Sequence, residues 1–121
     1  MIERPGSDFM LDVIKTLDLE YMTTNPGSSF RSLHESLVNY GGNKKPELLT
    51  CMHEEAAVAM AHGYAKAAGK PMGALIHGSV GVQHAAMLAA WASGESGKLV
   101  IASVKQFCLC PSSSTLTISG D

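Results

Sequence analysis

Residues 51–71 join a short apolar segment to a helix that opens with two acidic side chains. The preceding apolar run, residues 48–52, is typical of a buried strand. After it, small and apolar side chains recur at helical spacing, at Ala57, Met60, Ala61, Tyr64 and Ala68. Gly69 and Pro71 are expected to end this helix. The pattern predicts a strand that delivers the carboxylate of Glu54 to a helix N-terminus, and the other segments are interpreted by how they could surround this acid.

Strand and helix patterns alternate along the rest of the chain. Strands are expected at residues 19–24, 48–52, 72–77 and 99–104. Further helices are expected from Asp8 with Ser7 as cap, from a cap at Ser28 or Ser29 to Tyr40, and over residues 82–92, where Met87 and Trp91 should face the core. Alternation with continuous apolar strands predicts an α/β fold, a parallel sheet with helices on both faces. We assign residues 1–105 to this single domain and residues 106–121 to an irregular tail.

Three polar or glycine-rich loops follow predicted strands. They are Asn25–Ser28, His53–Glu54 and His77–Gly81, and the last is expected to be a turn of small residues. Carboxyl ends of parallel strands lie at one edge of a sheet, and ligands of such sheets bind beyond that edge. The fold class therefore predicts that the three loops converge.

Composition excludes several classes of partner. The chain has 121 residues, a net charge of −2 and 45% hydrophobic residues, so neither a basic nucleic-acid surface nor a disordered chain is indicated. We expect no membrane segment and no secretory signal, because no apolar run approaches the required length. The odd count of three cysteines argues against a disulfide framework. These features favour a cytoplasmic protein.

Each candidate site residue also has an ordinary structural interpretation. Glu54 could share a proton with a heterocyclic nitrogen, but first-turn acids are commonly placed there by the helix dipole. His77 could be catalytic or a hydrogen-bonded structural group, and Ser28 a reactant or a helix cap. The glycines at 78 and 81 lack dinucleotide-loop spacing, and Ala57 stands where a zinc-protease motif needs its second histidine.

Residues 53–71, HEEAAVAMAHGYAKAAGKP, resemble the signature of the pyrimidine-binding domain of thiamine diphosphate enzymes. This group includes acetolactate synthase, benzoylformate decarboxylase and pyruvate oxidase. Counting back nine residues from Gly63 places the family glutamate at Glu54. Two further segments follow in the family order, the Asn-Pro-Gly-Ser turn at 25–28 and the loop at 77–84. The resemblance covers about residues 6–90.

The resemblance implies a cofactor and roles for individual residues. Glu54 would hydrogen-bond a ring nitrogen of the aminopyrimidine of thiamine diphosphate and so activate the thiazolium carbon towards a 2-oxo acid. Ser28 and His77 match positions that contact substrate and move protons in the decarboxylase branch, and Pro26 and Gly27 belong to the turn that lies at the cofactor. The sequence His77-Gly78-Ser79 departs from the acetolactate synthase loop and favours a decarboxylase-like relative. His84 replaces a frequent asparagine, so no cofactor contact is assigned to it.

The second half of the family's cofactor site has no counterpart in this sequence. Family enzymes hold the diphosphate through Mg²⁺ with a Gly-Asp-Gly motif on another domain, whereas the only Gly-Asp here is Gly120-Asp121. We also expect residues after about Ser93 not to be family sequence. One hypothesis is a pyrimidine-binding subunit that needs a separate diphosphate-binding domain or partner chain to turn over 2-oxo acids. The other is a non-catalytic fragment or binding module of the same fold. A homo-oligomer is also expected, because a lone copy would expose part of the alanine-rich helix.

Overall fold

The computed structural model describes residues 4–95 and 99–104 of the chain. The elements in chain order are α1 (Gly6–Lys15), β1 (Tyr21–Thr24), η1 (Ser28–Phe30), α2 (Arg31–Glu35), η2 (Ser36–Tyr40), β2 (Glu47–Thr50), α3 (Glu54–Ala68), β3 (Met72–His77), α4 (Gly78–Glu95) and β4 (Leu99–Val104). The tail predicted for residues 106–121 lies outside the described residues. None of the helices in the described ranges could span a membrane.

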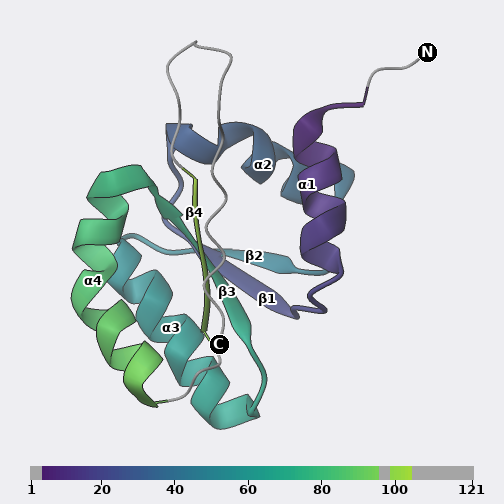
Figure 1. Cartoon of the computed structure of the whole chain (residues 1–121). Coiled ribbons are helices and arrows are strands. Elements are labelled where there is room, and N and C mark those ends of the chain that lie inside the picture. The colour runs from purple at the N-terminus through teal and green to yellow at the C-terminus, as the bar shows by residue number, and fades with distance from the viewer. Residues whose placement is uncertain (1–3, 96–98, 105–121) are drawn as a thin grey trace.

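The four strands form one parallel sheet in the order β2-β1-β3-β4. The chain moves outward from β1 to β2, crosses back past β1 to β3, and continues to β4. Because strand crossovers are right-handed, this reversal puts the β1-to-β2 connection on one face and the next two connections on the other. Figure 1 shows α1 and α2 on one side of the sheet and α3 and α4 on the opposite side. The predicted α/β fold with helices on both faces is confirmed.

Strand β3 supplies apolar side chains to both faces of the sheet, because successive side chains of a strand point in opposite directions. The face under α3 and α4 buries Val58, Ala61, Met72, Ala74, Ile76 and Ala85. The face under α1 and α2 buries Leu11, Met22, Phe30, Leu33, Leu37, Leu48 and Leu75. Along β3, His77 falls on the same face as Leu75, which directs it towards the chain that follows β1.

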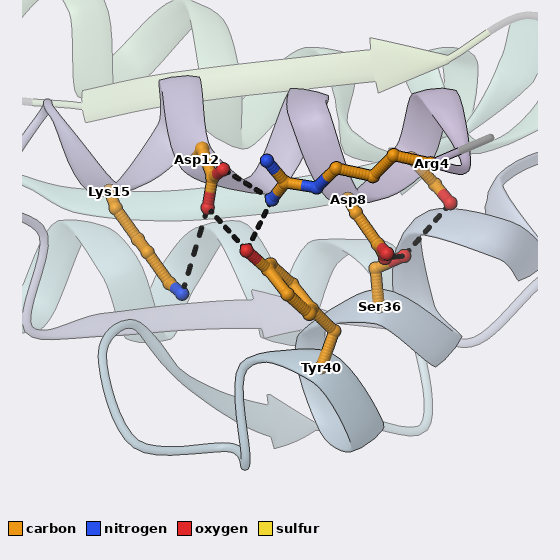
Figure 2. Close-up of polar contacts among 7 residues, drawn as sticks. Arg4, Asp8, Asp12, Lys15, Ser36 and Tyr40 are labelled. Carbon is orange, nitrogen blue, oxygen red and sulfur yellow. Dashed lines mark hydrogen bonds and ion pairs between the residues drawn. The ribbon is translucent and has the colours of Figure 1, made fainter. Parts of the chain in front are cut away.

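Helix α1 is held to η2 by polar side chains as well as by its apolar stripe. The guanidinium of Arg4 contacts both the carboxylate of Asp12 and the hydroxyl of Tyr40, and Lys15 lies 3.9 Å from Asp12 (Figure 2). The hydroxyl of Ser36 lies 2.7 Å from an oxygen of Asp8. Arg4, Lys15 and Tyr40 are exposed, so their polar contacts add little stability, whereas Ser36 is buried.

Two helix starts differ from the sequence prediction. Helix α1 begins at Gly6 after Pro5, and no side chain caps it. The hydroxyl of Ser7 instead lies 2.8 Å from that of Ser36, so it serves the packing of α1 on η2. After β1 the chain forms a 3₁₀ turn, η1, whose start at Gly27 also lacks a side-chain cap. Neither Ser28 nor Ser29 therefore acts as the predicted cap.

The segment 78–81, predicted as a turn, is the first turn of α4. Glycine costs up to about 1 kcal/mol in a helix interior, so propensity argues against this conformation. Packing explains the glycine at position 81, because a side chain there would meet Glu54 of α3 and His77 of β3. Met87, predicted to face the core, is 85% exposed. Strand β2 ends at Thr50, two residues before its predicted end.

Candidate functional site

The carboxyl ends of β1 and β3 lie side by side at the point where the strand order reverses. After β1 the chain runs to β2 on one side of this pair, and after β3 it runs to β4 on the other side. Such a switch point leaves a crevice beyond the strand ends where α/β proteins bind ligands. The loop after β1, the start of α3 and the start of α4 all begin at this edge.

The start of α3 is fastened to the central strand β1. The backbone N–H of Cys51 donates to the carbonyl of Thr24 at 2.7 Å, which continues the pairing of the strands into the loop. The hydroxyl of Thr23 donates to the carbonyl of Ala57 at 2.9 Å, so a buried side chain of β1 ties down the first turns of α3. These bonds fix the helix start, and with it the position of Glu54.

Glu54 is the first residue of α3 and only 7% exposed. Its carboxylate lies against Gly81 of α4, where an added Cβ atom would be 3.0 Å from Oε1 of Glu54 and 3.1 Å from Cβ of His77. The acid of α3 and the histidine of β3 therefore meet across a residue without a side chain.

The loop after β1 contacts the same histidine. A Cβ atom at Gly27 would lie 2.0 Å from Cδ2 of His77, so the half-buried imidazole occupies the space that a side chain would need. The ring of Phe30 packs edge-on against it, with 6.3 Å between ring centroids. Thus Gly27, His77 and Glu54, which the sequence assigned to three separate loops, come together at one edge of the sheet.

The serines of the turn are placed differently from one another. Ser28 and Pro26 are exposed, and the hydroxyl of Ser28 has no hydrogen-bond partner among the described residues. In that part of the chain, no hydrogen bond joins Ser28 to Glu54 or His77. The hydroxyl of Ser29 is buried and also lacks a partner in the described ranges. Sequence reasoning treated Ser29 only as a possible cap, and no sequence signal distinguishes its environment from that of Ser28.

A histidine that the sequence reasoning set aside lies next to the acid. Nδ1 of His84 is 2.9 Å from Oε2 of Glu55 and 3.5 Å from Oε2 of Glu54. The ring of His53 is 5.8 Å from that of His84, centroid to centroid. The packing of α4 against α3 brings these groups together, and a helical start at Gly78 is what places His84 on the second turn. The predicted turn at 78–81 concealed this relation.

The described residues fit one half of thiamine diphosphate. A buried carboxylate at a helix start, with one oxygen against a glycine and the other near an imidazole, can share a proton with a ring nitrogen. Among the described residues, the polar groups assembled at this edge are the buried Glu54, the partly exposed Glu55, histidines and hydroxyls, and they include no cluster of aspartates for a Mg²⁺ ion bound to diphosphate. The site therefore suits an aminopyrimidine, and the residues present do not account for the diphosphate.

A parallel α/β domain with a buried acid at its switch point defines a class of ligand-binding domain. The chain belongs to the thiamine pyrophosphate enzyme family, and residues 4–107 match its N-terminal TPP binding domain. This match extends past Ser93, so the expectation that family sequence ends there is wrong. No curated protein matches the chain.

Two solved structures show the same fold. A chain described as a thiamin diphosphate-dependent enzyme from Mycobacterium smegmatis has a TM-score of 0.66 and 27% identity over 84% of this chain. Benzoylformate decarboxylase from Polynucleobacter necessarius has a TM-score of 0.63 and 21% identity over 84% of this chain. In each case the match spans 18% of the solved chain.

Proposed function

We propose that this domain binds the aminopyrimidine ring of thiamine diphosphate and activates it through Glu54, as part of a decarboxylase that acts on a 2-oxo acid. The cofactor, when bound, supplies an electron sink for cleavage beside a carbonyl group. The observation that carries the proposal is the buried carboxylate of Glu54 at the switch point of a domain of this family.

Glu54 is suited to hold a proton shared with a ring nitrogen. It is 7% exposed, so a hydrogen bond that it makes is shielded from competing water. Its helix is tied to β1 by the hydroxyl of Thr23, so the carboxylate is positioned before any ligand arrives. Positioning of this kind is what a proton-transfer group requires.

His77 and Ser28 are proposed to contact the 2-oxo acid and move protons. His77 is half-buried, is held by Gly27 and Phe30, and lies beside the acid. Ser28 is exposed at the same edge, so its hydroxyl is accessible to a bound substrate. Pro26 and Gly27 are proposed to lie against the cofactor ring, because they belong to the turn that leads to Ser28, and Gly27 lies against His77.

We propose that another domain or a partner chain holds the diphosphate through Mg²⁺, because the sequence has no Gly-Asp-Gly motif. Apolar side chains are exposed on and next to the helices that border the site, at Met52 (84%), Val80 (70%), Val82 (42%) and Met87 (85%). Exposed apolar side chains of this size favour association with another surface. A homo-oligomer or a diphosphate-binding chain would cover them, whereas a non-catalytic module would not need the buried acid.

The proposal is tested by calorimetric titration of thiamine diphosphate with Mg²⁺ into the full chain and into its Glu54→Gln variant. A hydrogen bond to a charged group contributes about 1.5–3 kcal/mol, so we expect the variant to bind roughly 10–100-fold more weakly. Glu35→Gln is the matched control, because this exposed acid of α2 lies on the other face of the sheet. Equal affinity of the Glu54→Gln variant and the unchanged chain would remove the assignment.

Turnover gives a second test. The purified chain with thiamine diphosphate and Mg²⁺ is expected not to decarboxylate 2-oxo acids, because it supplies one half of the cofactor site. Addition of a diphosphate-binding chain should restore activity that Glu54→Gln then abolishes. Measurable carbon dioxide release by the chain alone would contradict the proposed division of the site.

A further inference from the structure

Three side chains that can ligate a metal ion meet where α3 packs against α4. His53 directly precedes α3, Glu55 lies in its first turn, and His84 lies in the second turn of α4. One ligand atom from each residue can be chosen so that all three lie within 4.8 Å of one another. The side chains of Glu55 and His84 are 44% and 49% exposed, so an ion can reach them from solvent.

We propose that His53, Glu55 and His84 form a binding site for a divalent transition-metal ion, with Zn²⁺ as the reference ion. Two imidazoles and one carboxylate are a common protein ligand set for Zn²⁺, with an open fourth position. Ligand bonds of about 2.0–2.2 Å put the ligand atoms around a tetrahedral ion roughly 3.4 Å apart. Side-chain rotations that move these atoms by about 1 Å would bring them from within 4.8 Å of one another to this spacing. Nitrogen ligands favour Zn²⁺, Co²⁺ or Ni²⁺ over Mg²⁺, which distinguishes this site from a diphosphate site.

The present contacts show how such an ion would be accommodated. Nδ1 of His84 and Oε2 of Glu55 are 2.9 Å apart, as expected for a hydrogen bond. An ion bound to Nδ1 displaces the hydrogen-bonded proton to solvent and requires the neutral imidazole tautomer that carries its proton on Nε2. The backbone does not need to move, because exposed side chains of α3 and α4 supply the ligands. The bound ion would cross-link the starts of the two helices.

The site also adjoins the buried acid. Oε2 of Glu54 lies 3.5 Å from Nδ1 of His84, so an ion bound to His84 would lie at the entrance to that carboxylate. The ordinary alternative is an exposed ion pair between His84 and Glu55 with no affinity for metals. The two alternatives differ in a direct measurement of metal binding, which needs neither cofactor nor activity.

The test is calorimetric titration of ZnCl₂ into the full chain carrying Cys108→Ser and Cys110→Ser, which removes two thiols that could bind zinc themselves. We expect one ion per chain with a dissociation constant in the micromolar range. Replacement of His84 with Ala, or of Glu55 with Gln, should weaken binding at least tenfold. His34→Gln is the control, because this histidine belongs to α2 and should leave zinc affinity unchanged.

Co²⁺ provides an independent readout, since its visible absorption reports nitrogen ligands and coordination number. The parent chain should give this absorption, the His84→Ala variant should lose it, and 5 mM Mg²⁺ should not displace Co²⁺. If His84→Ala disturbs the fold, as judged by circular dichroism, the Glu55→Gln and His53→Gln variants decide the question. The proposal is overturned if the parent binds no Zn²⁺ at 100 µM, or if all site variants bind as tightly as the parent.

Discussion

Replacement of Gly27 with Ala should destabilise the domain only while His77 is present. The backbone at Gly27 is extended, with φ −151° and ψ 156°, so alanine introduces no backbone strain. Its Cβ atom would lie 2.0 Å from Cδ2 and 3.0 Å from Cγ of the imidazole. Carbon atoms prefer separations of about 3.5–4.0 Å, so the ring must retreat by roughly 1.5 Å.

The magnitude follows from two opposing contributions. Overpacking of this kind costs about 1–3 kcal/mol, because the ring is also held by Phe30. Replacement of glycine by alanine stabilises by about 0.4–1 kcal/mol where the backbone allows it, since the unfolded chain loses freedom. We therefore expect Gly27→Ala to lower the free energy of unfolding by about 1–2 kcal/mol. In a His77→Ala background the same change should raise it by about 0.4–1 kcal/mol.

Urea unfolding of the four chains in this double-mutant cycle measures both values. With a denaturant slope of about 1–1.5 kcal/mol/M for a domain of this size, Gly27→Ala should shift the midpoint down by roughly 1 M. The coupling energy between the two positions should reach about 1.5–3 kcal/mol. An equal effect of Gly27→Ala in both backgrounds would refute the contact between the loop after β1 and the histidine of β3.

Two further predictions concern contacts away from this histidine. Thr23→Val removes the buried hydroxyl that donates to the carbonyl of Ala57, and urea unfolding should show a loss of about 1–2 kcal/mol in the free energy of unfolding. The control is Thr16→Val, at an exposed helix end, which should cost under about 0.5 kcal/mol. Equal costs for the two variants would contradict the buried bond. The hydrogen bond from Tyr64 to Glu20 raises the pKa of Tyr64 to about 12. Its stabilisation should be complete below pH 10 and lost as the pH rises through about 12, and ultraviolet titration of a Glu20→Gln variant should show tyrosine ionisation at lower pH.

Local signals were sufficient where one residue decides the conformation. The end of α3 was predictable because Gly69 adopts φ +67°, a left-handed conformation that glycine favours at a helix end. Strand β3 was predictable from its continuous apolar run, and its burial from Met72 to Ile76 agrees with a strand covered on both faces. The strand end at His77 was therefore predicted correctly.

The remaining differences come from tertiary contacts that sequence spacing does not report. The lack of space for a side chain at Gly81 comes mainly from Glu54 of α3, which is distant from it in the sequence. His84 could not be associated with Glu55 until residues 78–81 were known to be helical. The catalytic roles of Glu54, His77 and Ser28 stay predictions.

The bond from Thr23 to Ala57 has a consequence for motion in α3. It restrains the first turns of this helix, whereas residues 66–69 at its far end are exposed. A helix restrained at one end and exposed to solvent at the other opens first at the exposed end, so opening events near Gly69 need not reach the acid. Thermal fluctuation is thereby directed away from the crevice, and amide hydrogens of the last turn should exchange with solvent well before those of the first.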